Sequence, residues 1–277
     1  MRPVEVVRRG TSYLARHGVP SPDVNAELLM ASVLRTDRAG LARRSEPLTP
    51  AEAKAYGRVL CRRCTGTPLQ HLTGEQGFRH LLLTVRPGVF VPRPETEVVV
   101  DAALGELRGR RRPRVVDLGT GAGTIALALK HERPGAQVWA TDVAGPAVEL
   151  ARENAARLGL EVEVLRGDLF APLPDDLRGR VDLVVSNPPY VAPASAPALP
   201  AEVLADPPEA VFGGPEIYER ILPGAAVWLR SGGAAVVEIE EHLGERVAAI
   251  ARDAGFTEVD VRPDLNARDR VVVGRCA

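Results

Sequence analysis

The sequence has few lysines, cysteines and aromatic residues, and it contains no long apolar run. Of the 35 Lys and Arg residues only Lys54 and Lys130 are lysine, a bias typical of GC-rich coding. Three cysteines, Cys61, Cys64 and Cys276, are too few to indicate a disulfide framework. No stretch approaches the roughly 18 apolar residues of a membrane helix, and the arginine-rich start lacks the apolar core of a signal peptide. These absences predict a cytoplasmic protein that does not enter a membrane.

Charge is spread unevenly along the chain, although the net charge is only −1. Residues 1–73 hold twelve Lys or Arg and six Asp or Glu, so this part has a modest basic excess and the remainder is acidic. A solvated basic face and a docking surface for an acidic partner both fit this pattern. The sequence leaves the two interpretations open.

The composition and length favour one large globular domain and one small one. The first 73 residues carry helical signals. An amphipathic stretch covers 3–18, a helix-start signal with apolar positions at helical spacing begins at 21–23, and a further helix covers 49–60 with proline in its first turn. Residues 1–73 are therefore predicted to form a small helical bundle without a catalytic constellation, and we assign it to partner recognition.

The segment 74–97 is predicted to be a hairpin linker. Its β-rich runs, 81–85 and 89–91, are separated by Pro87 and Gly88, which together favour a turn.

The third part, 98–277, alternates between strand and helix patterns. The expected strands cover 115–118, 138–143, 162–165, 181–185, 234–239, 258–261 and 271–273. The expected helices cover 97–107, 124–131, 146–158, 217–229 and 245–254. Such alternation builds a mostly parallel sheet covered by helices. The last two strands have no helix between them, which predicts an antiparallel edge.

A glycine loop directly follows the strand 115–118 and opens a helix. The loop comprises Gly119, Thr120, Gly121, Ala122 and Gly123. Glycines allow a sharp turn and a close approach to a ligand, and the helix start offers free N–H groups. Asp142 ends the next strand, where a carboxylate can accept both ribose hydroxyls of a nucleoside cofactor. The loop lacks the wider Gly-x-Gly-x-x-Gly spacing, and Asp117 would suit a methionine ammonium better than phosphates, so S-adenosylmethionine is favoured over a nicotinamide cofactor.

A second motif follows the apolar strand 181–185 and comprises Ser186, Asn187, Pro188, Pro189 and Tyr190. The carboxyl edge of a parallel sheet is where such folds bind ligands. An amide or aromatic amine is hard to methylate because its lone pair is delocalised. The side-chain oxygen of Asn187 and the carbonyl of Pro188 can each accept a hydrogen bond from the NH2 group, and Tyr190 can pack on the flat group. The pattern predicts catalysis by positioning, with no metal.

These motifs resemble those of class I S-adenosylmethionine-dependent methyltransferases that act on exocyclic or amide nitrogens. The segments 66–74, 90–97 and 268–273 extend the resemblance to the protein-(glutamine-N5) methyltransferases that modify peptide chain release factors. The resemblance implies an α/β, Rossmann-like fold with a mostly parallel seven-stranded sheet, preceded by a small N-terminal helical domain. It also implies methyl transfer to the side-chain amide N5 of the glutamine in a Gly-Gly-Gln motif of release factors, with 1–73 contacting the factor.

The resemblance also assigns site residues. It implies that S-adenosylmethionine binds to Gly119, Thr120, Gly121, Ala122, Gly123, Asp142, Asp168, Leu169 and Asn187. It implies catalytic positions at Asn187, Pro188 and Tyr190, and substrate contacts at Asn187, Pro188, Pro189, Tyr190, Arg93 and Glu95. The family usually has an Asp-Gly-Leu type of turn after Pro215, and this chain is about three residues shorter there.

Two other functions are compatible with parts of the pattern. An N-methyltransferase acting on a nucleobase amine of DNA or RNA faces the same lone-pair problem, but it would normally carry a target-recognition module or a strongly basic face, so no direct nucleic-acid partner is expected. A non-enzymatic binding protein that keeps the cofactor fold would be indicated by the loss of Asn187 or of the glycines, and these residues are present.

Cys61 and Cys64 have ligand-like spacing without a second Cys or His pair, so we expect packing rather than zinc binding.

Overall fold

The computed structural model describes residues 1–277 and divides the chain into two compact units. The helical unit comprises 1–75 together with 200–205, and the sheet unit comprises 76–199 together with 206–277. No helix in either unit combines the length and the apolar character needed to cross a membrane.

The helical unit contains three longer helices and three short ones. They are α1 (Pro3–Arg16), α2 (Pro22–Val33), α3 (Arg38–Arg43), α4 (Pro50–Cys64), α5 (Leu69–Thr73) and α9 (Ala201–Leu204). The three longer helices occur where the sequence predicted helices. The short helices α3, α5 and α9 were not predicted, because a helix of one or two turns is too short to show an apolar periodicity. A side-chain cap marks α3, where Asp37 accepts a hydrogen bond from the Gly40 amide at 2.6 Å.

Apolar side chains of α1, α2 and α4 build the core of the helical unit around Tyr56, whose hydroxyl donates to the Ala26 carbonyl at 3.1 Å. Arg63 of α4 is also buried. Its guanidinium donates to Asn25 on α2 at 2.7 Å and forms an ion pair with Glu202 on α9. A segment that follows the Asn187 motif in sequence is therefore part of the helical unit.

The predicted hairpin is wrong in its register. The two-stranded sheet pairs β1 (Glu75–Phe78) with β2 (Leu81–Thr84), and 89–91 forms no strand. The turn lies at Arg79, which has a positive φ of 50°. Arg79 is held there by long-range contacts that the local sequence does not reveal, because its amide donates to Glu97 at 2.9 Å and its side chain pairs with Glu132.

The sheet unit is built on a seven-stranded sheet in the order β5-β4-β3-β6-β7-β9-β8. The strands are β3 (Arg114–Leu118), β4 (Gln137–Asp142), β5 (Val162–Arg166), β6 (Val181–Ser186), β7 (Leu229–Glu238), β8 (Glu258–Pro263) and β9 (Asp269–Arg275). The first five in spatial order are parallel, and β9 is antiparallel to both β7 and β8. The predicted antiparallel edge is confirmed.

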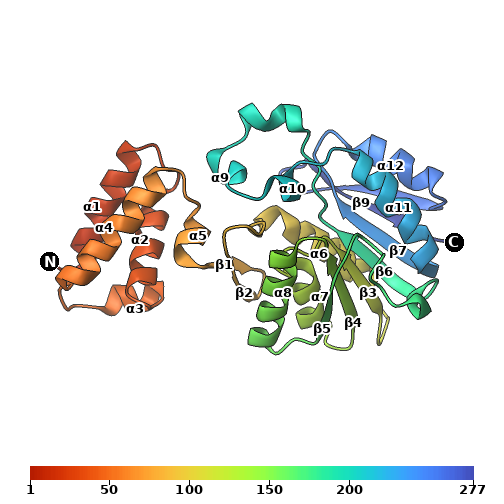
Figure 1. Ribbon diagram of the computed structural model, residues 1–277, viewed down its shortest axis with the longest axis horizontal. Helices are drawn as coiled ribbons and strands as arrows, with labels where there is room; N and C mark the ends of the chain where they lie inside the picture. Colours follow the sequence, from red (N-terminus) through yellow and green to blue (C-terminus); the bar gives the residue numbers. More distant parts are fainter. The chain divides into compact units, whose positions relative to one another are not determined.

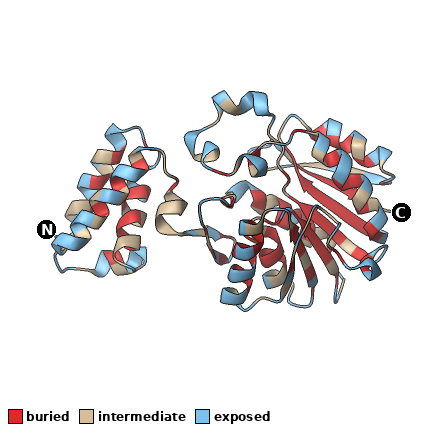
Figure 2. Cartoon of the chain, viewed as in Figure 1, coloured by how far each residue is buried: buried red, intermediate tan, exposed pale blue.

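Helices cover both faces of this sheet (Figure 1). One face packs against α6 (Glu97–Glu106), α7 (Thr124–Glu132) and α8 (Gly145–Leu158), and the other against α11 (Glu216–Trp228) and α12 (Gly244–Asp253). The strand pattern explains the two layers, because Val115 faces the first group of helices and Val116 the second. Figure 2 shows the resulting buried sheet between helices whose outer faces are exposed.

The remaining elements of the sheet unit are short: η1 (Pro94–Thr96), η2 (Asp175–Leu177), η3 (Pro193–Ala198) and α10 (Pro208–Val211). The parallel register brings the ends of β3, β4, β5 and β6 to one edge, since Leu118 pairs with both Thr141 and Ser186. The loops that leave these strands therefore meet at the carboxyl edge of the sheet.

Candidate active site

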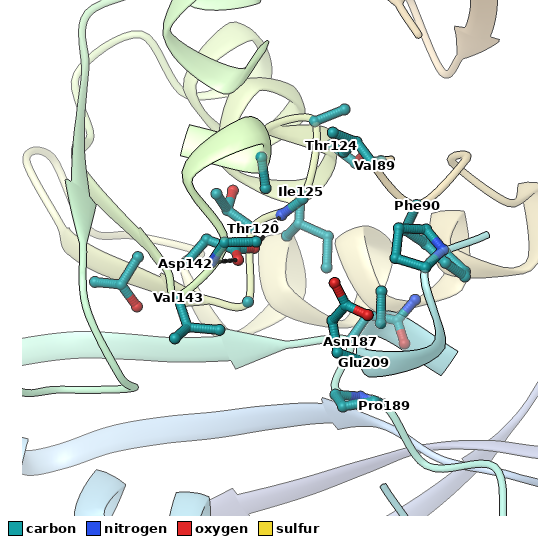
Figure 3. Close-up of a pocket in the computed structure, with 18 of the residues that line it drawn as sticks. Val89, Phe90, Thr120, Thr124, Ile125, Asp142, Val143, Asn187, Pro189 and Glu209 are labelled. Carbon is teal, nitrogen blue, oxygen red and sulfur yellow. Dashed lines mark hydrogen bonds between the residues drawn. The ribbon is translucent and has the colours of Figure 1, made fainter. Parts of the chain in front are cut away.

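A cavity opens at the carboxyl edge of the parallel strands, within the sheet unit. Its wall is formed by the glycine loop after β3, the segments after β4 and β5, the motif after β6, and residues from 88–96 and 207–220. In the view of Figure 3, Thr120 and Asp142 lie across the cavity from Asn187, Pro189 and Glu209. The two motifs that the sequence singled out thus line the same space.

The glycine loop is held against the end of β4 by backbone hydrogen bonds. The amides of Gly119 and Thr120 both donate to the Thr141 carbonyl, at 2.8 and 3.0 Å. At the end of the loop Gly123 has a φ of +86°, and a Cβ there would lie 2.8 Å from a methyl carbon of Leu127. A glycine is required at this point, both for the backbone conformation and for the packing of α7.

Asp142 fixes the middle of the loop. One carboxylate oxygen accepts from the Gly121 amide at 2.9 Å, and the other accepts from the Ala144 amide at 2.9 Å. Burial raises the pKa of the Asp142 carboxyl, while these amide hydrogen bonds oppose the rise. The side chain remains part of the cavity wall, so it can hold the loop and still face a ligand.

Asp117 does not lie where the sequence suggested. It is fully buried behind the glycine loop rather than in the cavity wall. Its Oδ2 accepts from the Thr120 hydroxyl at 2.6 Å and from the Ala126 amide at 3.1 Å. Burial raises the pKa of Asp117 to about 7. Its observed contacts tie the loop to α7, which the spacing of the motif could not reveal.

Asp168 and Leu169 both line the cavity, after β5. The Asp168 carboxylate is exposed and pairs with Arg220 of α11, which also lines the cavity. Leu169 has a positive φ of 48° and contributes an apolar surface beside this ion pair.

Asn187 is half-buried and borders the cavity at the end of β6. Its side-chain nitrogen donates to the hydroxyl of Thr96 at 3.0 Å. With the nitrogen engaged, the amide oxygen of Asn187 remains as a hydrogen-bond acceptor for a ligand. Pro189 also lines the cavity, and its carbonyl approaches Gly213 so closely that a Cβ there would lie 2.1 Å from it.

Four predicted site residues lie outside the cavity wall: Gly123, Pro188, Tyr190 and Glu95. Gly123 caps α7, Pro188 is buried, and Glu95 is exposed on η1. The predicted contact of Tyr190 with the substrate stays a prediction, and Tyr190 lies outside the cavity wall. Its ring packs against the core beneath α11, and its hydroxyl donates to the Glu238 carboxylate at 3.0 Å.

Arg93 is in the wall as predicted, and its surroundings add residues that the sequence did not indicate. It forms an ion pair with buried Asp206 and lies over the Phe90 ring at 5.2 Å. Asp206 also accepts from the Val91 amide at 3.1 Å, so this amide is engaged by a side chain and not by a neighbouring strand. Phe90, Thr96 and Glu209 are among the wall residues that the sequence did not indicate, and Asp206 lies behind the wall. No local sequence signal marks any of these positions.

No group of three or more His, Cys, Asp or Glu side chains is arranged to hold a metal ion. Cys61 and Cys64 both lie on α4, where Cys61 is exposed and Cys64 is partly buried.

Comparison with known proteins decides the family. Residues 5–74 match the family described as PrmC N-terminal domain, and residues 81–261 match the family described as Methyltransferase small domain. A release factor glutamine methyltransferase from Moorella thermoacetica is 43% identical over 96% of this chain and 94% of its own length. The chain belongs to the release factor glutamine methyltransferase family. The family that the sequence resembled is thereby confirmed.

Other relatives agree in name and in fold. A release factor glutamine methyltransferase from Deinococcus radiodurans is 42% identical over 99% of this chain and 98% of its own length. Among solved structures, a 16S rRNA N2 G1207 methyltransferase from T. thermophilus, in complex with AdoMet and guanosine, superimposes with a TM-score of 0.56. It is 21% identical, with 73% of this chain and 50% of that chain covered, and so it supports the class I methyltransferase fold alone.

Proposed function

We propose that this protein transfers the methyl group of S-adenosylmethionine to the side-chain amide N5 of the glutamine in the Gly-Gly-Gln motif of peptide chain release factors. The proposal depends on one observation: the side-chain nitrogen of Asn187 donates to Thr96, so the amide oxygen is left as an acceptor at the cavity. Membership of the release factor glutamine methyltransferase family supports the same substrate. Neither a metal nor a strong base is needed for such a transfer if the nitrogen is correctly placed.

The cavity fits the cofactor chemically. Its glycine loop offers a wall without side chains, Asp142 provides carboxylate oxygens for ribose hydroxyls, and Leu169 provides an apolar surface for an adenine ring. Because Asp142 already accepts two backbone amides, its orientation is fixed before a ligand arrives. S-adenosylmethionine supplies an electrophilic methyl group on its sulfonium when bound.

Asn187 then acts on the acceptor nitrogen. Its side-chain oxygen accepts one hydrogen bond from the glutamine NH2 group, and the main-chain carbonyl of Pro188 is the proposed acceptor of the second, although Pro188 is buried and lies outside the cavity wall. Both contacts favour a pyramidal nitrogen, whose lone pair is no longer shared with the carbonyl. They are stronger in the transition state than in the planar ground state, so they lower the barrier of the chemical step.

The helical unit is proposed to contact the release factor. It carries the basic excess of the chain, with Arg8, Arg9 and Arg16 exposed on α1. It also includes α9, whose Glu202 is paired with Arg63.

The test uses methyl-labelled S-adenosylmethionine with a purified release factor, with the same factor carrying glutamine-to-alanine in its Gly-Gly-Gln motif, and with total RNA and duplex DNA from the same cells. We expect label only in the unaltered factor, at the glutamine side chain by mass spectrometry. Label in nucleic acid alone would support the nucleobase alternative. Absence of label in every sample, with cofactor bound, would support a non-enzymatic role.

A further inference from the structure

A second pocket of the sheet unit lies at the edge opposite the active-site cavity. The strands β4, β3, β6 and β7 are neighbours in the sheet and run parallel, so their first residues meet at the amino edge. Each of these strands, or the loop before it, contributes a polar residue to the pocket. The wall includes Gln137 at the start of β4, Arg114 at the start of β3, Gly179 and Arg180 before β6, Asp182 on β6 and Arg230 on β7.

Asp182 is the only acidic residue in this wall, and donors occupy both of its carboxylate oxygens. Its Oδ1 accepts from the guanidinium groups of Arg110 at 2.7 Å and Arg230 at 2.6 Å. Its Oδ2 accepts from the main-chain amide of Arg114 at 2.8 Å. The two guanidinium groups offset the charge of Asp182, and Asp182 in turn fixes the direction of the Arg230 side chain.

The guanidinium groups of Arg114 and Arg180 are not neutralised. Both line the pocket, and neither side chain takes part in an ion pair or a hydrogen bond. Arg180 is exposed and Arg114 is half-buried. The sheet unit as a whole contains more Asp and Glu than Lys and Arg. Two uncompensated positive charges in one concave wall therefore stand out from an acidic unit and attract an anion.

The chemistry of the wall favours a phosphate group over a carboxylate. A guanidinium group can bind either anion through paired hydrogen bonds. A phosphate monoester carries up to about two negative charges and three terminal oxygens, so it can pair with Arg114 and Arg180 together and also accept from the amide of Gln137. A single carboxylate has one charge and would leave one guanidinium group unpaired.

The composition of the wall also limits what else is recognised. It contains no apolar or aromatic side chain on which a base or an acyl chain could pack, and such side chains are what most small-molecule pockets use. Recognition at this edge is therefore confined to the phosphate group.

We propose that this pocket is a phosphate-binding site, separate from the active-site cavity. The phosphate comes either from a free phosphate compound or from the backbone of single-stranded RNA, since both present the same oxygens to Arg114 and Arg180. The site lies at the other edge of the sheet, so the inference does not depend on the proposed function. The RNA arm of the test also examines the expectation that the chain has no nucleic-acid partner.

The test uses the full chain with saturating S-adenosylmethionine, so that the active-site cavity is filled. The probes are pyrophosphate, a short labelled oligouridylate, and a labelled oligoglutamate with the same number of charges as the oligouridylate. Calorimetry measures the binding of pyrophosphate, and fluorescence anisotropy measures the binding of the two polymers at a series of KCl concentrations.

The decisive variant combines Arg114→Gln with Arg180→Gln and removes both unpaired guanidinium groups. Its matched control combines Arg246→Gln with Arg252→Gln, which removes the same charge from exposed positions of α12 outside the pocket. Thermal unfolding shows whether each variant is folded. If the first pair does not fold, Arg180→Gln alone replaces it, because Arg180 is exposed in a loop.

We expect the parent to bind at least one phosphate probe more tightly than the oligoglutamate, and the Arg114 and Arg180 pair to lose about tenfold in affinity. For the oligouridylate, the dependence of log affinity on log salt should fall by about 1 for each lost phosphate contact. Binding of pyrophosphate without the oligouridylate would identify a free phosphate compound, and binding of the oligouridylate would identify backbone phosphates. Equal affinity for the oligoglutamate, no binding of either phosphate probe, or an equal loss in the α12 control would overturn the proposal.

Discussion

The Asp142 carboxylate accepts a hydrogen bond from the Gly121 amide at 2.9 Å, so the end of β4 holds the glycine loop that follows β3. Replacing Asp142 with alanine removes this contact and the proposed acceptor for the ribose hydroxyls. We expect Asp142→Ala to weaken S-adenosylmethionine binding at least tenfold, which corresponds to roughly 1.4 kcal/mol. Isothermal titration calorimetry measures the change.

Asp176→Ala is the matched control, because Asp176 is exposed on η2 and is not part of the cavity wall. Its affinity for the cofactor should equal that of the parent. Equal affinity in Asp142→Ala as well would remove Asp142 from the binding site and leave it only a structural contact of the loop.

The buried carboxyl of Asp117 leads to a prediction about how the stability of the fold depends on pH. Burial raises its pKa from 3.8 to about 7, opposed by hydrogen bonds from Thr120 and Ala126, while the nearby charge of Asp142 raises it further. Well below pH 3.8 the carboxyl is neutral in both the folded and the unfolded state. As the pH rises toward 7 it ionises first in the unfolded chain, so the folded state loses stability relative to the unfolded state over this range.

Asp117→Asn keeps an acceptor for Thr120 and Ala126 and cannot ionise. Between pH 5 and pH 8 the variant should therefore gain about 2 kcal/mol in free energy of unfolding relative to the parent. Urea unfolding at the two pH values measures this difference, with Asp176→Asn as the surface control. Parallel pH dependence in the variant and the parent would show that Asp117 ionises equally in both states.

The basic helical unit leads to a prediction about the partner. Reversing two exposed charges with Arg8→Glu and Arg9→Glu should raise KM for the intact release factor about fivefold at low salt, because charge pairs at an interface mainly affect encounter. The effect should shrink at high ionic strength. Cofactor affinity should not change, since the cavity lies in the sheet unit.

Arg111→Glu with Arg112→Glu provides the control. Both residues are exposed in the sheet unit, before β3. If this pair raises KM as much as the α1 pair does, the effect comes from the total charge of the protein, and the assignment of partner contact to the helical unit is wrong.

The sequence predicted features that depend on neighbouring residues. The alternation of strand and helix patterns predicted the fold class of the sheet unit. The glycine loop and the Asn187 motif were predicted to lie at one sheet edge, because parallel strands end at the same edge. The residues that support these motifs could not be found in this way. Thr96 meets Asn187 across 91 positions in sequence, and Asp206 meets Arg93 across 113.

The error in the hairpin has a similar origin. The hairpin was predicted from the turn at Pro87 and Gly88, but the amide of Val91 donates to Asp206 rather than to a strand. Tyr190 was assigned to the substrate because it adjoins the motif; that contact stays a prediction, and the Tyr190 hydroxyl donates to buried Glu238 across 48 positions in sequence. Buried carboxylates require hydrogen-bond donors, and both Asp206 and Glu238 accept from a residue that is distant in sequence.

Asn187 gives the prediction that separates mechanism from binding. Asn187→Ala removes the acceptor oxygen and the donor to Thr96, while the backbone of the motif can keep its path between β6 and Gly213. We expect this variant to fold and to keep most of its cofactor affinity. Its single-turnover rate at saturating substrate should fall on the order of 100-fold or more, similar to the loss of one preorganised polar contact in other enzymes.

Asn187→Asp sharpens the comparison. It keeps an acceptor toward the substrate, but its carboxylate has no N–H group to donate to Thr96 and adds a negative charge at the cavity wall. If the acceptor alone were sufficient, Asn187→Asp would stay active; if the amide must be anchored through its nitrogen, both variants should be slow. A contact of equal strength in the ground state and the transition state changes KM and leaves kcat unchanged. A near-normal rate in Asn187→Ala, with only weaker substrate binding, would therefore mean that Asn187 holds the substrate without acting on the chemical step.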